Sequence, residues 1–140
     1  MKIIMCSDHA GYNLKQEIKK HLSGYEIVDV GAENIDANDS YVDYAKKANQ
    51  EMIKNVDNIG IYVCGSGVGM SIVANKQRGV RAVLGYSPEI VQKAREHNNA
   101  NVLCLGERFT NTALAIQIVD AFLLGKFLGG KYEDRIKTIE

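Results

Sequence analysis

Short apolar runs alternate along the chain with longer stretches in which apolar residues recur at helical spacing. The runs are short and rich in β-branched residues, which predicts strands over Lys2–Cys6, Glu26–Val30, Asn58–Val63, Arg81–Leu84 and Val102–Leu105. The periodic stretches, such as Leu14, Ile18 and Leu22, predict helices over Tyr12–His21, Tyr41–Lys54, Met70–Asn75, Pro88–Glu96 and Thr110–Leu124. A last short helix is predicted over Tyr132–Glu140, and the polar stretch Glu33–Ser40 predicts a loop.

This alternation predicts a single α/β domain over residues 1–140, with a doubly wound, Rossmann-like sheet of five parallel strands flanked by helices. In such sheets a ligand binds beyond the carboxyl ends of the strands, where the strand order reverses. If that point lies between the first and third strands, it brings together the loops Ser7–Gly11 and Cys64–Gly69.

The charges of the chain balance, with 17 basic and 17 acidic residues. A net charge of zero does not indicate nucleic-acid or membrane partners, so any anion site must be built locally. No apolar run is long enough to span a bilayer, and the start lacks a signal peptide, so we expect a cytoplasmic protein. Three widely spaced cysteines predict free thiols, and no CxxC or HxxxH spacing offers a metal site.

A glycine-rich loop, Cys64–Gly69, stands between the third strand and the next helix. Its glycines allow backbone N–H groups to face an anion, and a helix N-terminus favours negative charge. The spacing excludes the dinucleotide fingerprint and the Walker loop. A cysteine phosphatase would carry an arginine where Met70 stands, and a response-regulator receiver would carry aspartate in place of Cys64. The alternative is a tight strand-to-helix turn without a ligand.

Cys64 is the cysteine best placed for reactivity, because a helix N-terminus favours the thiolate. A thiolate at this position could remove a proton from carbon. Cys6 and Cys104 lie inside predicted strands, where cysteine packs as a small apolar residue.

Several polar residues near strand ends or in the tail could complete a site for a sugar or a phosphate: Asp8, His9, His97, Asn98, Arg108, Lys131 and Arg135. Lys131 and Arg135 would share one face of a tail helix. Taken singly, the histidines could be structural, the segment His97–Asn99 could cap the helix before the fifth strand, and the cations could be solvated. Together they could form a cationic pocket of the kind that a phosphate needs.

Over nearly its whole length the chain resembles the ribose-5-phosphate isomerase B (RpiB/LacAB) family of sugar-phosphate isomerases. The resemblance rests on motifs that occur in order, namely Ser7–Lys15, Ile61–Ile72 with Ala74–Lys76, Ala94–Leu103, Leu105–Arg108 and Gly129–Gly130. It implies interconversion of ribose 5-phosphate and ribulose 5-phosphate through an enediolate, without metal or cofactor.

The resemblance also implies a role for each candidate residue. Cys64 would be the base, and Ser66 with the amides of Gly65, Gly67, Val68 and Gly69 would stabilise the oxyanion. His97 would open the sugar ring, while Asp8 and Asn98 would contact the sugar. The phosphate would be held by His9, Arg108, Lys131 and Arg135. The family forms dimers, often paired into tetramers, and the partner subunit would supply His97, Asn98 and Arg108.

Two segments differ from the family pattern. Ser40-Tyr41-Val42 stands where the family has Asp-Tyr-Pro, and Lys131-Tyr132 stands where it has Arg-His. Both segments lie where the length of the substrate would be sensed. A six-carbon substrate, allose 6-phosphate or galactose 6-phosphate, is therefore an alternative. A non-catalytic module that binds a nucleotide or phosphosugar is another.

Overall fold

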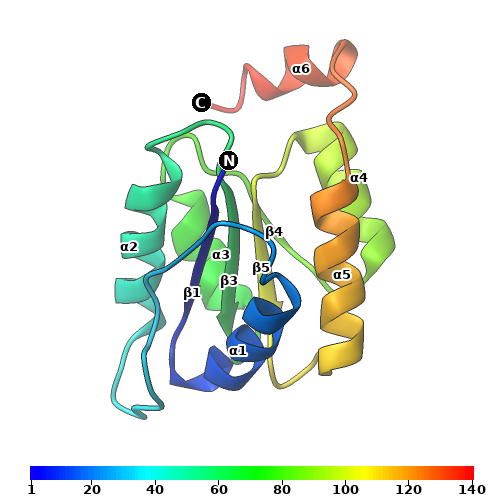
Figure 1. The fold of residues 1–140 in the computed structure, drawn as a ribbon. Coiled ribbons are helices and arrows are strands. Elements are labelled where there is room, and N and C mark those ends of the chain that lie inside the picture. The colour runs from blue at the N-terminus through cyan, green and yellow to red at the C-terminus, as the bar shows by residue number, and fades with distance from the viewer.

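The strands of the computed structural model, which describes residues 1–140, form one parallel sheet in the order β2-β1-β3-β5-β4 (Figure 1). They are β1 (Ile3–Ser7), β2 (Ile27–Asp29), β3 (Ile59–Cys64), β4 (Ala82–Leu84) and β5 (Val102–Gly106). The order reverses between β1 and β3, because β2 lies on one side of β1 and β3 on the other. The doubly wound parallel sheet and its predicted switch point are therefore confirmed.

Helices cover both faces of the sheet (Figure 1). They are the short 3₁₀ helix η1 (His9–Gly11), α1 (Tyr12–His21), α2 (Tyr41–Met52), α3 (Val68–Asn75), α4 (Pro88–Asn98), α5 (Thr112–Leu124) and α6 (Lys131–Ile136). One apolar cluster packs α1, α4 and α5 against the sheet, and a second packs α2 and α3 against the other face. The short α6 lies beyond the amino ends of the strands, at the opposite edge from the arrowheads in Figure 1.

The central strand β3 is buried on both faces, which explains its continuous apolar sequence. Because side chains alternate along a strand, Ile61 and Val63 join the α1/α4/α5 cluster, while Tyr62 and Cys64 join the α2/α3 cluster. The buried Tyr62 hydroxyl donates to Asn49 Oδ1 at 3.0 Å, so its polar end keeps a partner. Cys64 thus reaches the end of a rigid strand at the point where the order of the strands reverses.

The predicted elements are confirmed in type and differ mainly at their ends. Helix α3 begins at Val68 rather than Met70, because Gly67 adopts φ 80 and turns the chain directly into the helix. Helix α4 continues to Asn98 rather than Glu96, and ends because Asn99 takes the left-handed φ of 47.

Other ends differ for the same kind of local reason. Helix α5 begins at Thr112 rather than Thr110, because the Asn111 side chain accepts the Leu114 N–H at 2.9 Å as an N-cap. The tail helix α6 covers fewer residues than predicted. A 3₁₀ turn forms over His9–Gly11, where the sequence had predicted only a loop.

All three cysteines are free, as predicted, and Cys64 is buried along with Cys6 and Cys104. None of the helices combines the length and the apolar character that crossing a membrane would require.

Gly11 and Gly24 offer a matched test of how tightly η1 is seated on β3. A Cβ at Gly11 would lie 2.4 Å from the Val63 carbonyl oxygen, whereas a Cβ at Gly24 would meet nothing within 4 Å. Gly11→Ala should therefore lower the free energy of unfolding by about 1–3 kcal/mol, and Gly24→Ala should leave it unchanged or raise it slightly. Urea unfolding measures both. Equal effects of the two substitutions would contradict the close approach.

Candidate active site

The loop after β3 wraps the Cys64 sulfur with backbone. The Gly67 N–H donates to Cys64 Sγ at 3.1 Å, and the Val68 N–H donates to Ser66 Oγ at 3.2 Å. Cys64 is 5% exposed, so its sulfur sits just beneath the surface of the loop. The Cys64 sulfur therefore accepts a backbone N–H at the start of α3.

The loop is held against β5 and its neighbours. A Cβ at Gly106 would lie 2.5 Å from the Ser66 carbonyl carbon, so the two backbones approach as closely as only glycine allows. The Tyr86 hydroxyl donates to the Ser66 carbonyl oxygen at 2.7 Å. The Arg108 side chain lies over Gly65, since a Cβ there would meet its Nη1 at 3.0 Å. The loop geometry is therefore fixed by contacts from the next strand.

Asp8 ends the neighbouring strand β1 and is 5% exposed. Its Oδ1 accepts the N–H groups of Ala10 and Gly11 at 3.0 and 3.1 Å, which caps η1. Its second oxygen accepts no hydrogen bond from the protein. Burial raises the pKa of the Asp8 carboxyl above its ordinary value, against the lowering effect of the Gly11 N–H. Asp8 can thus offer a carboxyl oxygen to a sugar hydroxyl.

His9 is held by a residue that the sequence did not single out, Asp39. The Asp39 Oδ1 lies 2.6 Å from His9 Nδ1 and also accepts the His9 backbone N–H at 3.1 Å. This side-chain hydrogen bond is the main cause that raises the pKa of His9. Asp39 lies in the polar loop before α2, and no local spacing links it to a histidine 30 positions earlier.

A pocket of about 400 Å³ brings these loops together. It is lined by Asp8, His9, Ala10, Tyr41, Cys64, Gly65, Ser66, Val68, Gly69, Ile72 and Arg108. Tyr41, which was not among the predicted site residues, also lines the pocket, and its ring packs directly against Gly69. Arg108, which the family resemblance assigned to the partner subunit, lines this pocket of its own chain.

The remaining predicted site residues lie elsewhere. His97, Asn98 and Arg135 line a different pocket, of about 310 Å³, together with Tyr132 and residues of the tail. The rings of His97 and Tyr132 stack with centroids 4.4 Å apart, and Lys131 Nζ lies 5.3 Å from the Tyr132 centroid. This group sits where α4 ends against α6, at the edge of the sheet opposite the Cys64 loop (Figure 1). One chain alone therefore does not unite Cys64 with His97.

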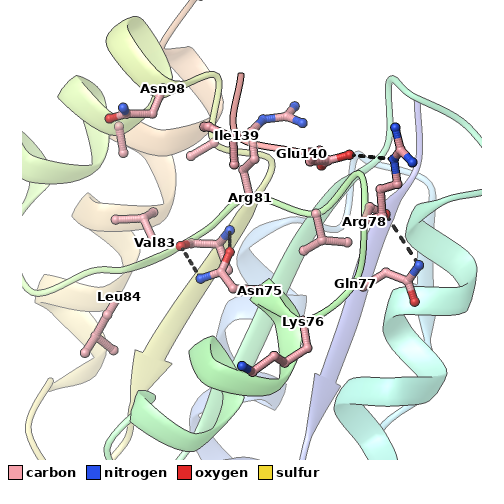
Figure 2. Close-up of a pocket in the computed structure, with 14 residues that line it drawn as sticks. Asn75, Lys76, Gln77, Arg78, Arg81, Val83, Leu84, Asn98, Ile139 and Glu140 are labelled. Carbon is pink, nitrogen blue, oxygen red and sulfur yellow. Dashed lines mark hydrogen bonds and ion pairs between the residues drawn. The ribbon is translucent and has the colours of Figure 1, made fainter. Parts of the chain in front are cut away.

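The largest pocket, about 790 Å³, lies between α3, β4, α4 and the C-terminal residues and contains neither Cys64 nor His97 (Figure 2). On its wall, Asn75 pairs with both backbone groups of Ala82, at 3.0 and 2.7 Å, and thereby fastens the end of α3 to the edge strand. Glu140 Oε2 accepts a hydrogen bond from Arg78 Nε at 3.1 Å, which holds the last residue over the pocket. These contacts explain Asn75 in the central motif as a structural residue.

Asp8, His9 and Asp39 are the residues that could together hold a metal ion, since their ligand atoms lie within 4.8 Å of one another. However, Asp8 Oδ1 and Asp39 Oδ1 already accept backbone N–H groups, and His9 Nδ1 already faces Asp39. The hydrogen bonds account for this arrangement without a cation.

Comparison with known proteins places the chain among sugar-phosphate isomerases. The family model described as Ribose/Galactose Isomerase matches residues 3–139. A probable ribose-5-phosphate isomerase B of Mycoplasma genitalium is 44% identical, covering 98% of this chain and 92% of that protein. Ribose-5-phosphate isomerase B of Escherichia coli is 40% identical, covering 99% and 93%. The crystal structure of the Mycoplasma genitalium enzyme with bound ribulose 5-phosphate superposes with a TM-score of 0.95 at 44% identity, covering 99% and 93%.

The packing of Tyr41 against Gly69 of α3 gives a test in which the effect of one substitution on stability changes sign. A Cβ at Gly69 would lie 2.5 Å from the Tyr41 ring, so Gly69→Ala should lower the free energy of unfolding by about 1–3 kcal/mol. In a Tyr41→Ala background the collision is gone, and the same substitution should stabilise by up to about 1 kcal/mol, since alanine favours helix more than glycine. Urea unfolding of the four proteins gives the coupling energy. Equal effects in both backgrounds would contradict the contact.

Proposed function

The chain belongs to the ribose/galactose isomerase family, and we propose from this that it interconverts ribose 5-phosphate and ribulose 5-phosphate with Cys64 as the base. It is a sugar-phosphate isomerase, and this favours catalysis over the alternative of a non-catalytic binding module. The observation that carries the proposal is the Cys64 sulfur, which accepts a backbone N–H at the wall of a pocket that also holds an imidazole and a guanidinium.

The proposed reaction moves one proton between neighbouring carbons. The Cys64 thiolate takes the proton from C2 of the open-chain aldose, and the C2–H electron pair shifts towards the C1 carbonyl to give an enediolate. Return of the proton from the thiol to C1, with transfer of the O2 proton to O1, gives the ketose. Ser66 and the loop amides are the donors available to the developing oxyanion, and the start of α3 adds a favourable dipole.

His9 and Arg108 supply positive charge at the same pocket, which suits the phosphate group. Asp8 lines the same pocket and is suited to a sugar hydroxyl. Because proton transfer at carbon needs neither a redox centre nor a Lewis acid when such donors are present, the proposed mechanism uses no metal or cofactor.

We further propose that the working form is a homo-oligomer, a dimer or a tetramer, in which the site is shared between subunits. The support is that His97 and Asn98 lie at the opposite edge of the sheet from Cys64, near Lys131 and Arg135. An isologous contact between two chains would bring each group to the other's pocket. His97 of the partner subunit would then open the sugar ring, and Asn98 of the partner subunit would contact the sugar.

The partner subunit's Lys131 and Arg135 would add to the phosphate site. Free buried cysteines are typical of a reducing compartment, which supports a cytoplasmic location. Six-carbon sugar phosphates remain the alternative substrates, because the matching family includes galactose isomerases.

Replacement of the proposed base is the direct test. Cys64→Ala should reduce turnover of ribose 5-phosphate to background, because no other group at the loop is placed to accept the C2 proton. The fold and the affinity for inorganic phosphate should be retained. Cys104→Ala is the matched control, since Cys104 is buried within β5, and it should keep its activity. The readout is proton NMR in heavy water, which detects both the product and deuterium at the exchanging carbon.

Near-normal exchange in Cys64→Ala would refute the assignment of the base. Absence of product and exchange with the unaltered protein would move the substrate to allose 6-phosphate or galactose 6-phosphate, which the same assay distinguishes.

Subunit mixing tests the shared site. Cys64→Ala and His97→Ala should each be defective alone. After the two are mixed, dissociated and reassembled, each mixed dimer should contain one site with both native residues, restoring about a quarter of the activity of the unaltered protein. A site confined to one chain would instead give no recovery on mixing.

A further inference from the structure

We propose that Asp39 is a positioning residue that orients the His9 imidazole and keeps it cationic for the phosphate group of the substrate. The inference rests on the proposed function, since it assigns His9 to the phosphate. It adds a residue outside the motifs of the sequence and outside the wall of the pocket.

Geometry fixes the orientation of the ring. Asp39 Oδ1 lies 2.6 Å from His9 Nδ1 and 3.1 Å from the His9 backbone nitrogen, so one carboxylate oxygen makes two hydrogen bonds with His9. With Nδ1 engaged, Nε2 is the ring nitrogen left for a ligand in the pocket. The second contact ties the backbone at the start of η1 to the same oxygen, so the ring and the backbone of His9 are both held at one carboxylate.

The surroundings of Asp39 favour a proton on the ring. The Asp39 side chain is only 8% exposed, and its Oδ2 is buried without a hydrogen-bond partner. No lysine or arginine pairs with it, so His9 is its only protein cation partner. A buried carboxylate in this position stabilises the imidazolium.

Other charged groups act on His9 with smaller effect. Asp8, at the end of β1, also raises the pKa of His9, and Arg108, after β5, lowers it. From the α2 side, burial and the nearby Asp39 raise the pKa of Tyr44, so that phenol stays neutral and adds no competing charge. The balance favours a cationic His9 beside Arg108.

Ser40 leaves the Asp39 carboxylate available to His9, because Ser40 itself caps the following helix. The Ser40 Oγ accepts the Val42 N–H at 3.2 Å and caps α2, so the neighbouring carboxylate is not needed as the cap. In this chain the helix cap and the partner of His9 are separate, adjacent residues.

The experiment compares the unaltered protein with Asp39→Asn, which keeps the shape and one acceptor but removes the charge. Asp43→Asn is the matched control, because it removes a carboxylate from the first turn of α2 that does not contact His9. The imidazole nitrogens of His9 are followed by NMR during a pH titration without substrate. Asp39→Asn should bring the pKa of His9 down towards its ordinary range, and Asp43→Asn should leave it nearly unchanged.

The kinetic readout is the ratio of KM between Asp39→Asn and the unaltered protein across pH. In acid both proteins carry the imidazolium, so the ratio should be near one. It should rise to about tenfold as the pH passes the ordinary pKa of histidine, where only the unaltered protein keeps the charge. It should fall again above the raised pKa. The value of kcat should change little, because His9 does not touch the reacting carbons.

A His9→Gln background separates action through His9 from a general structural effect. There Asp39→Asn should change KM little at any pH. A flat KM ratio in the native background, or an unchanged NMR titration, would overturn the proposal even if the protein isomerises ribose 5-phosphate. If ribose 5-phosphate is not a substrate, the NMR titration and the affinity for inorganic phosphate across pH still decide the role of Asp39.

Discussion

The close approach of backbones at the carboxyl ends of β1, β3 and β5 is the constraint on which the rest of the structure depends. Added Cβ atoms at Gly11 and Gly106 would lie 2.4 Å and 2.5 Å from backbone atoms of the β3 end and its loop. These two contacts, from opposite sides, clamp the end of β3 where Cys64 stands. Glycine is required at both places because any side chain would push the loops apart.

This clamp determines the electrostatics of the site. The Gly67 N–H donates to the Cys64 sulfur, and Gly67, at φ 80, turns the chain directly into α3. Glu107, at the end of β5, accepts the Leu14 N–H at 2.6 Å and so ties the start of α1 to the same edge. His9 and Arg108, which flank these anchors, are thereby held at one pocket. Anion-stabilising groups thus meet because the strands that precede them are neighbours in the sheet.

The sequence predicted the fold and half of the site well, for reasons that particular residues make clear. Strand-to-helix alternation and the Cys64 loop are local patterns, so the parallel sheet and the placement of Asp8 at the same pocket as Cys64 followed from them. Asp39 could not be found in this way, because its contact with His9 joins positions without any shared periodicity. The sequence also did not predict two helix ends. Asn99 ends α4 through its left-handed backbone angle, and Asn111 starts α5 through a single side-chain cap.

The family resemblance assigned Arg108 to the partner subunit, whereas the Arg108 side chain lies over Gly65 of its own chain, a contact that sequence order cannot reveal. This position of Arg108 reduces the set of groups that a partner subunit would have to supply. If Arg108 and His9 both belong to the chain that holds Cys64, then one chain already places an imidazole and a guanidinium at the pocket of the proposed base. What the Cys64 pocket of a single chain lacks is His97, the residue proposed to open the ring. In the proposed oligomer, association would add His97 and the charges of the tail to a pocket that already holds Cys64, His9 and Arg108.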